Sequence, residues 1–493
     1  MLSKSFAFRI FVVAIILRLI PVFLTRGLGI GLDDMFQYDM LARSIVSGNG
    51  YRWYAQADLN QLAPFVDFDL STVKDYEPVR GIRTSFRAPL YPAFLALVYF
   101  FRGTGSSRFF AARLAQAIFL GAPLAPLTYL VSLRLFSSTS GVGGVREERK
   151  SERASKIAAW VVACYPMLLI YPLGLGTENP FFLLLLASFF FLLKSYKQPT
   201  SLNFLLAGFF LGLTALTRSV ILPFVGLTIL WAWFILKRLR GAVLIVSAFV
   251  LTIAPWVIRN SLLHHKLTGI ETSMGYNLYL GYYPQGNGSF VFGPSLDLLT
   301  ILDDAERDRI GTQKAIQFIE AQPERFIPLA MNRLGFFFGL EKRVLMYFYG
   351  NNIIGYVPLP LLLIISVILL LPFVFISTSA ALGLSFLRWR PEHILLGLLL
   401  VGYILPHVFI LSEDRFHLAL VPYIAILAAL FWVNGFSALA DRWHGSRSSK
   451  ILVAFAIFAT LLLILNWGFE LNRDWDKIAQ LLGPNGNRSF FPY

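Results

Sequence analysis

The residues best suited to chemistry in this sequence are carboxylates and arginines that stand at the ends of apolar runs. Asp33 and Asp34 follow the first run, and Glu178 lies in a short turn between two later ones. Four arginines occupy similar places: Arg87, Arg218, Arg259 and Arg415. A guanidinium offers a rigid donor fork to phosphate, and a carboxylate can accept a proton from a hydroxyl or an amine. The set therefore indicates group transfer from a lipid-linked phosphate donor.

Each of these residues also has a structural interpretation when it is taken alone. Arg218 and Arg259 fit interfacial anchors whose stems lie along apolar surface. Glu178 fits a first-turn acid that the helix dipole stabilises, and Asp33 with Asp34 fits a solvated pair. Arg415 has Glu413 and Asp414 beside it in the sequence. Two polar neighbours, Asn260 and His417, join the candidates, and a lone histidine such as His417 is more often structural.

The composition says which elements must position these side chains. The chain has 493 residues, 56% hydrophobic and only 14% charged, whereas soluble chains are near a quarter charged. This excludes an ordinary soluble protein and a disordered one. The single Cys164 excludes an intramolecular disulfide framework and a cysteine metal site. The net charge of +15 is then typical of basic cytoplasmic loops rather than of nucleic-acid binding.

Apolar runs near the spanning length of about 20 residues predict an all-α polytopic integral membrane protein with about eleven transmembrane helices. No cleavage-site pattern follows the first run, so we expect a retained helix. The predicted spans are 6–25, 109–135, 157–173, 178–193, 202–217, 219–236, 241–258, 353–378, 393–411, 416–437 and 451–468.

The Lys and Arg residues of the loops predict the orientation of the chain. The short loops on one side contain only Arg218 and Arg415. The loops on the other side, together with the N-terminus, are therefore expected to be cytoplasmic. Their basic residues are Arg134, Arg146, Arg149, Lys150, Arg153, Lys156, Lys194, Lys197, Lys237, Arg238, Arg240, Arg388, Arg390, Arg442, Arg447 and Lys450.

The same orientation places the two longest loops outside the cytoplasm. The apolar stretch 89–101 is too short to span and would invert the topology, so we expect an interfacial helix there. The first outer loop is then 26–108 and the second is 259–352, with an amphipathic stretch near 312–345. We expect a catalytic transmembrane domain over 1–437, followed by a last transmembrane helix and a short outer tail within 438–493.

Other motifs add little. The sequence has no phosphate-binding Walker loop and no dinucleotide fingerprint. His264 and His265 have no third ligand at a convincing spacing, so no metal-binding residue is predicted. The tyrosines and tryptophans of the outer loops fit stacking on sugars, but an interfacial aromatic belt explains most of them better.

Several short motifs, in one order along the chain, resemble the GT-C glycosyltransferases. The similar branch is the bacterial one related to dolichyl-phosphate-mannose protein mannosyltransferases and aminoarabinose transferases. The matching stretches are Asp33–Tyr38 with Ala42 and Gly48–Tyr51, Arg87–Pro92, Thr177–Pro180, Leu216–Arg218, Pro255–Asn260, Asn277–Gly281 and Asp414–His417 with Pro422. They cover about 30–425, and their ordered set is more specific than any one of them.

The resemblance implies a GT-C-like membrane fold with an outer active site and a polyprenyl-phosphate sugar as donor. It implies an inverting reaction with a first-loop aspartate as general base. Alignment on Tyr38 and Ala42 selects Asp34, whereas alignment on the acidic pair selects Asp33; we favour Asp34, with Asp33 as helper. Glu178 would orient a sugar. The donor-binding candidates are Arg87, Tyr91, Arg218, Arg259, Asn260, Arg415 and His417.

The chain also departs from the aminoarabinose transferases. Phe86 and Arg87 stand where those enzymes have an acidic residue before the proline pair, and the C-terminal tail is short. This leaves a divalent-metal requirement and the identity of the acceptor (a lipid, a glycan or a protein) open.

We therefore predict a glycosyltransferase in the plasma (inner) membrane that acts at the extracytoplasmic face. Two other functions stay open from the sequence. One is an oligosaccharide ligase or polymerase with a lipid-pyrophosphate donor, and the other is a flippase or transporter for a lipid-linked sugar. Transporters often show inverted repeats, which this sequence lacks.

Overall fold

A computed structural model of the chain describes residues 2–70, 73, 75–136 and 145–490. The described chain is almost entirely helical; its one sheet pairs two short antiparallel strands, β1 (Arg52–Trp53) and β2 (Ile82–Arg83). The predicted all-α polytopic membrane fold is confirmed. Eight helices are long and apolar enough to cross a membrane: Ser5–Leu24, Arg108–Phe136, Glu178–Lys197, Leu239–His264, Leu359–Phe386, Pro391–Phe409, Asp414–Trp443 and Arg447–Arg473.

Eleven spans were expected, and helices occupy all eleven predicted stretches. A ninth span is counted if α7 (Val145–Cys164) and the helical segment Pro166–Leu173, bent by 51°, are taken together. The other two, Ser201–Ala215 and Ser219–Ile235, are apolar helices of fewer than 18 residues. The short stretch at 89–101 is also helical, as α4 (Leu90–Arg102).

The bend after α7 explains an arginine in the middle of an apolar helix. Pro166 has no N–H to donate to the carbonyl four residues earlier, at Val162. Arg18 of α1 (Leu2–Leu24) is fully buried and supplies donors instead. Its Nη2 lies 3.2 Å from the Val162 oxygen, and its Nη1 lies 3.5 Å from the Ala163 oxygen. Arg18 thus pins the first helix to the break.

α7 begins earlier than the apolar pattern suggested, because its first turns are charged. Val145 starts the helix, whereas the predicted span started at 157. Glu147 and Glu148 lie in the first turn, where the helix dipole favours acids. Lys156 pairs with Glu152 at 2.8 Å, one turn away. The basic residues expected in a loop therefore lie largely on a helix; residues 137–144 lie outside the described part.

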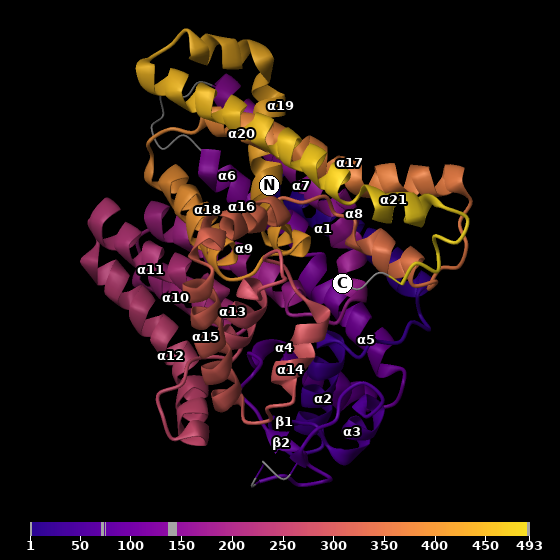
Figure 1. Cartoon of the computed structure of the whole chain (residues 1–493). Helices are drawn as coiled ribbons and strands as arrows, with labels where there is room; N and C mark the ends of the chain where they lie inside the picture. Colours follow the sequence, from indigo (N-terminus) through magenta and orange to yellow (C-terminus); the bar gives the residue numbers. More distant parts are fainter. Residues whose placement is uncertain (1, 71–72, 74, 137–144, 491–493) are drawn as a thin grey trace.

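Both long loops carry short helices, and those of the first loop gather at one end of the molecule (Figure 1). The first loop holds α2 (Asp34–Val46), α3 (Gln56–Leu62) and α4. The second holds α13 (Met274–Tyr282), α14 (Phe292–Leu299), α15 (Asp304–Ala321), α16 (Phe326–Phe337) and η7 (Leu345–Gly350). The turn between α19 (Val421–Trp443) and α20 (Arg447–Arg473) lies at the opposite end. The first long loop and this basic turn thus lie at opposite ends of the helix bundle.

The two long loops are joined by a buried polar contact. Asp304 accepts hydrogen bonds from the Thr84 hydroxyl at 2.6 Å and from the Ser85 backbone at 2.7 Å. Arg307, one turn along α15, pairs with the other oxygen of Asp304 at 3.0 Å. This contact fixes the strand of the first loop that leads to Arg87.

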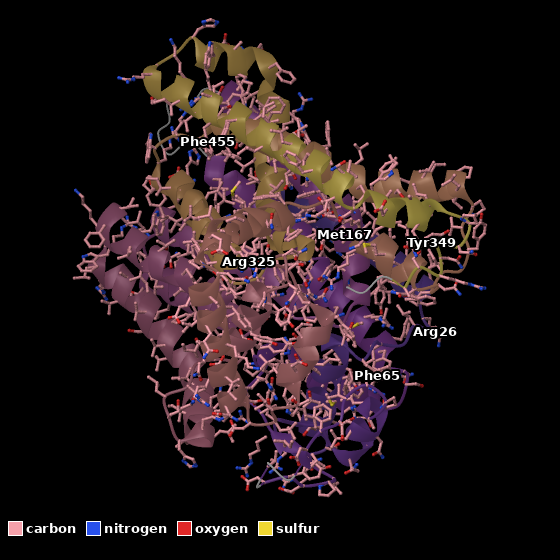
Figure 2. The ribbon with its side chains drawn as sticks, in the orientation of Figure 1. Arg26, Phe65, Met167, Arg325, Tyr349 and Phe455 are labelled. Carbon is pink, nitrogen blue, oxygen red and sulfur yellow. The ribbon has the colours of Figure 1, made fainter. Side chains whose placement is uncertain are left out.

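The end of the chain folds back over the second loop. Asn466 and Trp467 of α20 donate to the backbone oxygens of Gly335 and Phe338, at 3.0 and 2.8 Å. α21 (Trp475–Leu482) follows, and Phe490 then donates its backbone N–H to the Gly350 oxygen. The C-terminal segment therefore holds residues 335–350 in place. Figure 2 shows Phe455, on the exposed face of α20, far from Phe65 of the first loop.

Candidate functional site

The N-terminus of α2 presents the two predicted first-loop carboxylates in different ways. Asp33 is the N-cap: its Oδ1 accepts the backbone N–H of Met35 at 2.8 Å. Such a cap satisfies one of the free donors at a helix start. Asp34 is the first helical residue, and its side chain is 42% exposed. Asp33 is thus engaged with its own backbone, whereas Asp34 projects from the start of the helix.

Arg87 contacts one face of α2, the face that includes Asp34. Asp34, Gln37 and Tyr38 stand at positions i, i+3 and i+4, which share one helix face. Arg87 Nη2 forms an ion pair with Asp34 Oδ1, and its Nε donates to Gln37 Oε1 at 2.8 Å. The guanidinium lies 5.3 Å from the centre of the Tyr38 ring. Arg87 is therefore oriented by all three side chains.

The backbone around Arg87 is tied to two other elements. The Tyr51 hydroxyl donates to the Arg87 oxygen at 2.9 Å. Leu90, at the start of α4, donates its N–H to the Leu216 oxygen at 3.0 Å. This second bond brings the Arg87 segment beside the tight turn that carries Arg218.

Glu178, the first residue of α9 (Glu178–Lys197), links two of the predicted arginines. Its Oε1 lies 2.6 Å from Arg218 Nη1 and 3.7 Å from Arg415 Nε. Arg415 Nη2 in turn lies 3.9 Å from Asp34 Oδ2. Both guanidinium groups also lie near the Phe416 ring, at 5.1 and 5.5 Å from its centre. Asp34, Arg87, Glu178, Arg218 and Arg415 therefore form one connected group.

Two further residues, Glu413 and Arg343, extend this group, and neither was among the sequence-based candidates for the site. Glu413 Oε2 pairs with Arg415 Nε at 2.7 Å and with Arg343 Nη1 at 2.7 Å. Arg343 comes from the second long loop, just before η7. The only sign of Arg343 in the sequence is that it directly follows two other charged residues, Glu341 and Lys342. We call the seven residues the charge cluster: Asp34, Arg87, Glu178, Arg218, Arg343, Glu413 and Arg415.

The electrostatics of the charge cluster favour the ionised forms of Glu413 and Arg87. Burial acts to raise the pKa of Glu413, but Arg415 and Arg343 outweigh it and hold the pKa below its usual range. Burial acts to lower the pKa of Arg87, and the ion pair with Asp34 raises it instead. With four arginines and three carboxylates, the cluster has an excess of positive charge. Such a set suits one more anionic group.

Beside the cluster, Asp33 experiences the opposite effect. Burial and the neighbouring Asp34 carboxylate raise the pKa of Asp33 above its usual range. The two adjacent acids therefore differ in environment: Asp34 has an arginine partner, and Asp33 holds the helix N-terminus.

Arg259 and Asn260 lie outside the charge cluster. Arg259 donates to the backbone oxygen of Thr84 at 2.6 Å and to that of Tyr51 at 3.3 Å. Asn260 is fully buried and donates to the Gly269 and Ile270 oxygens, at 2.9 and 3.0 Å. Their hydrogen bonds are with the backbone of the two long loops and, between Arg259 Nη1 and Asn260 Oδ1 at 2.9 Å, with each other.

Tyr91 and His417 are fully buried, and their hydrogen bonds are with residues outside the charge cluster. The Tyr91 hydroxyl donates to Gln116 Oε1 at 2.6 Å, and its ring meets the Tyr38 ring edge to face at 5.1 Å. His417 lies 2.9 Å from Glu341 Oε1, and its ring stacks on Phe373 at 3.9 Å. Tyr91 thus packs against Tyr38, whose ring lies beside the Arg87 guanidinium. His417 belongs to a separate buried network.

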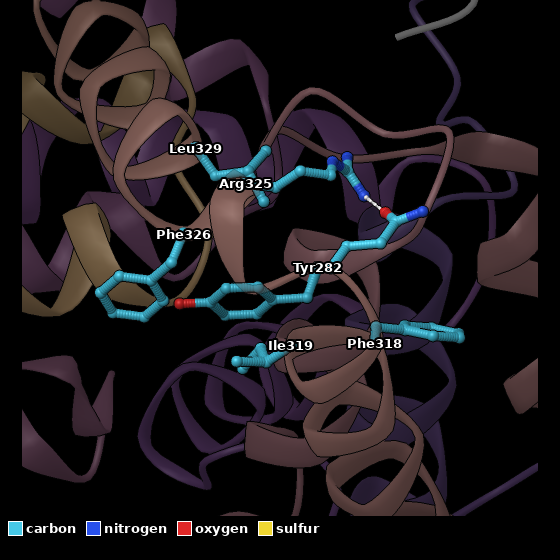
Figure 3. A pocket seen from close by; sticks show the side chains of 7 residues that line it. Tyr282, Phe318, Ile319, Arg325, Phe326 and Leu329 are labelled. Atoms are coloured by element: carbon cyan, nitrogen blue, oxygen red, sulfur yellow. Dashed lines mark hydrogen bonds between the residues drawn. The ribbon is translucent and has the colours of Figure 1, made fainter.

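Among residues 2–70, 73, 75–136 and 145–490, no three His, Cys, Asp or Glu side chains are grouped as metal ligands. A small hollow on the second loop is lined by aromatic and aliphatic side chains around Tyr282 and Arg325 (Figure 3). Arg325 is already bonded there, to Gln322 Oε1 and to the Gly286 oxygen, each at 2.7 Å. This hollow is therefore part of the packing between α13, α15 and α16.

Solved structures similar to this chain include a bacterial membrane enzyme. The chain is similar to the crystal structure of ArnT from Cupriavidus metallidurans bound to undecaprenyl phosphate. The likeness has a TM-score of 0.46 and a sequence identity of 13%, and it covers 97% of this chain and 74% of that one. No protein-family model matches the chain, and no curated protein matches it.

Proposed function

We propose that the chain is a membrane glycosyltransferase that moves a sugar from a polyprenyl-phosphate donor to an acceptor. One observation carries the proposal: a half-exposed Asp34 stands between Arg87 and Arg415, in a cluster that has excess positive charge. Arginine forks bind phosphate well, and a carboxylate beside them can act as a base. The order of the motifs along the chain supports the same reaction.

In the proposed reaction, a hydroxyl or amine of the acceptor attacks the anomeric carbon of the donor sugar. The bond between that carbon and the phosphate oxygen breaks, and its electron pair stays on the phosphate. The attacking group gives its proton to the Asp34 carboxylate. Because attack and departure take place on opposite faces of the sugar, the anomeric configuration inverts.

The arginines of the cluster would hold the leaving phosphate. Arg87 and Arg415 flank Asp34, so a phosphate bound by them would place the reacting carbon near its carboxylate. Hydrogen-bond donors that already point toward the site of developing negative charge lower the activation barrier most. Arg218 and Arg415 both contact Glu178, which would fix their guanidinium planes.

The cap formed by Asp33 favours Asp34 as the base. Asp33 uses Oδ1 to hold the start of α2, so its proposed contribution is to orient Asp34. Asp34 Oδ2 lies 3.9 Å from Arg415, longer than a hydrogen bond, and this oxygen is our choice for the proton acceptor. The active site is proposed to face away from the cytoplasm, in the plasma (inner) membrane.

The test is transfer of radiolabelled sugar from defined polyprenyl-phosphate sugars by the purified chain in liposomes that contain a membrane extract. Asp34→Asn keeps the size of the side chain but cannot take the proton, so transfer should fall by at least about 100-fold. Asn can still cap a helix, so Asp33→Asn should keep most of the activity.

Three results would reverse this assignment. Full activity in Asp34→Asn would remove Asp34 from the reaction. Transfer only from pyrophosphate-linked donors would identify the oligosaccharide ligase or polymerase instead, and lipid-linked sugar movement without transfer would identify the flippase. Unchanged thermal unfolding of both variants would show that the effects are not due to misfolding.

A further inference from the structure

A carboxylate of the second long loop contacts the turn that carries Arg218. Glu271 Oε1 accepts two hydrogen bonds from Ser219, one from its backbone N–H at 3.1 Å and one from its hydroxyl at 2.5 Å. Ser219 directly follows Arg218 and begins a short helical turn, Ser219–Ile221. The first N–H groups of a helical turn have no partner inside it, and the carboxylate supplies one. Glu271 is therefore held in one orientation although it lies in a loop.

The backbone on both sides of Glu271 is also fixed. Thr272 donates its N–H to the Ser85 oxygen at 3.0 Å. The oxygen of the residue before Glu271 accepts a hydrogen bond from the Asn260 amide at 3.0 Å. Ser85 lies two residues before Arg87, so one short stretch of the second loop reaches both the Arg87 segment and the turn described above. Glu271 thus stands between two arginine-bearing parts of the charge cluster.

The protein uses only one of the two oxygens of Glu271. Among the described residues, Oε2 has no hydrogen-bond donor, and the carboxylate forms no ion pair. The side chain is half-buried, and Oε2 is not one of the fully buried side-chain atoms without a partner. Oε2 therefore remains accessible from outside the protein. An ionised carboxylate oxygen can only accept hydrogen bonds, so a ligand group that meets it must donate one.

The carboxylate of Glu271 lies close enough to Arg87 to act on its charge. Burial acts to lower the pKa of Arg87; Asp34 raises it most, and Glu271 is one of the further groups that raise it. Asp34 forms an ion pair with Arg87, whereas Glu271 has no such contact in the described part of the chain. Arg87 Nη1 also has no acceptor there, since its Nε and Nη2 make the bonds to Gln37 and Asp34. A ligand bound to Nη1 thus has room to extend toward Glu271.

These contacts define the chemistry of the group that Glu271 would bind. A second anion, such as the phosphate itself, would be repelled by the carboxylate. A hydroxyl donates a hydrogen bond to it, and bonds of this kind to an ionised acceptor are about twice as strong as neutral ones. The donor sugar is bonded directly to the phosphate that Arg87 would hold. Its hydroxyls therefore come within reach of Glu271.

We infer that Glu271 determines donor specificity by accepting a hydrogen bond from one hydroxyl of the donor sugar through Oε2. Ser219 holds the other oxygen, so the carboxylate is oriented before the donor binds. The inference rests on the proposed function, since it needs a sugar attached to the bound phosphate. A site that bonds a substrate hydroxyl discriminates strongly against an analogue that lacks it, because the polar group of the site is then left unpaired.

A binding experiment tests this contact without catalysis. The purified full chain in detergent, with no acceptor, is titrated calorimetrically with undecaprenyl phosphate and with its glucosyl, galactosyl and mannosyl esters. At least one ester should bind more tightly than the bare phosphate. Monodeoxy forms of that ester then locate the hydroxyl. Removal of one hydroxyl should weaken binding to the wild type about 10- to 100-fold, the effect of one hydrogen bond to a charged group.

Glu271→Gln is the decisive variant. It keeps the size of the side chain and one oxygen for Ser219, but it replaces Oε2 by an amide nitrogen that accepts no hydrogen bond. The preferred ester should bind this variant about 10-fold more weakly. The difference between that ester and its deoxy form should disappear, and bare undecaprenyl phosphate should bind as it does to the wild type. A deoxy effect of the same size in Glu271→Gln and the wild type would overturn the assignment.

A purely structural role of Glu271 predicts a different pattern. If Glu271 only held the turn at Arg218, Glu271→Ala would weaken bare undecaprenyl phosphate and every ester by the same factor. That result would also overturn the specificity role. If Glu271→Ala fails to fold, Glu271→Gln still decides the question, because it retains the acceptor for Ser219. Thermal unfolding of both variants monitors the fold.

The matched control is Glu324→Gln, the same substitution at an exposed position of the second long loop. It should leave all affinities unchanged. Asp34→Asn should keep the deoxy effect while it loses transfer, which separates this inference from the proposed function. Transfer that depends on Asp34, without any deoxy effect that depends on Glu271, would overturn the inference about Glu271 alone.

Discussion

Oδ2 of Asp34 lies 3.9 Å from Nη2 of Arg415, an ion pair without a hydrogen bond. The two residues are far apart in the sequence and meet because the start of α2 and the turn before α19 lie at the same group of charges. The spacing leaves the carboxylate oxygen accessible beside a cation. This is the arrangement that a base needs when its substrate carries a phosphate.

Replacement of Arg415 by lysine should lower transfer by about 10- to 100-fold, which is roughly 1.4–2.7 kcal/mol of barrier. Lysine keeps the charge but loses the planar guanidinium, whose Nε lies near Glu413 and Glu178 while its Nη2 faces Asp34. The measurement is kcat and KM for the polyprenyl-phosphate donor. Arg388→Lys, on an exposed loop, is the control and should match the wild type. Wild-type kinetics in Arg415→Lys would argue against a role for the guanidinium.

A substitution series at Asp33 separates a helix cap from a general base. Asp33→Ser and Asp33→Asn retain a side chain that can cap α2, so activity should be nearly unchanged. Asp33→Ala removes the cap and should destabilise the protein by about 1 kcal/mol. Transfer assays and thermal unfolding in detergent measure the two effects. A complete loss of transfer in both capping variants would make Asp33 the base.

The sequence predicted the membrane fold and a large part of the charge cluster. Asp34, Arg87, Glu178, Arg218 and Arg415 were singled out because they stand at helix ends on one predicted face, and the structure brings them together. Helix ends are easy to locate from apolar runs. The basic loops predict the side of the membrane on which they lie.

The parts that the sequence missed depend on tertiary contacts. Arg343 lies at the end of the amphipathic stretch predicted near 312–345, but that pattern does not indicate its partner, and only the fold turns it toward Glu413. Arg259 has the motif context of a site residue, yet its guanidinium lies on backbone oxygens of the first loop. The charged start of α7 was expected to be a loop because apolar runs do not report helices held by ion pairs.

Acidification should lower the stability of the folded protein over a defined range of pH. The pKa of Glu413 lies below its usual value of 4.5, and that of Asp474 is lowered from 3.8 to about 2. Burial opposes both shifts, and the neighbouring arginines and Lys342 outweigh it. A depressed folded-state pKa stabilises the fold above the unfolded-state pKa. This contribution should be complete above about pH 5.5 and lost as the pH falls from about 4.5 toward 2.

The measurement is the thermal unfolding midpoint between pH 3 and 7, in the wild type and in Asp474→Asn. The variant should unfold at a lower temperature at pH 7, since it loses a hydrogen-bonded ion pair that contributes about 1–3 kcal/mol. Its midpoint should also change less with pH. Parallel curves for the two proteins would show that Asp474 does not contribute to the acid sensitivity. Asp476→Asn is the exposed control on the same segment.

Arg18→Met should destabilise the protein by about 1–3 kcal/mol without changing substrate specificity. The substitution keeps an unbranched side chain but leaves the Val162 and Ala163 oxygens without their donors at the proline break. Thermal unfolding in detergent measures the loss, and Arg9→Met, exposed on the same helix, is the control. An unchanged midpoint in Arg18→Met would mean that the break needs no side-chain donor.

The position of Arg18 has a consequence for the order in which the protein is made. During synthesis, α1 emerges long before residues 162 and 163, whose oxygens bind its guanidinium. A lone arginine near the middle of a helix costs about 2.5–3.5 kcal/mol in the lipid. We therefore expect the first helix to stay beside the insertion machinery until α7 has been synthesised. Its final integration is then coupled to the synthesis of a segment more than a hundred residues downstream.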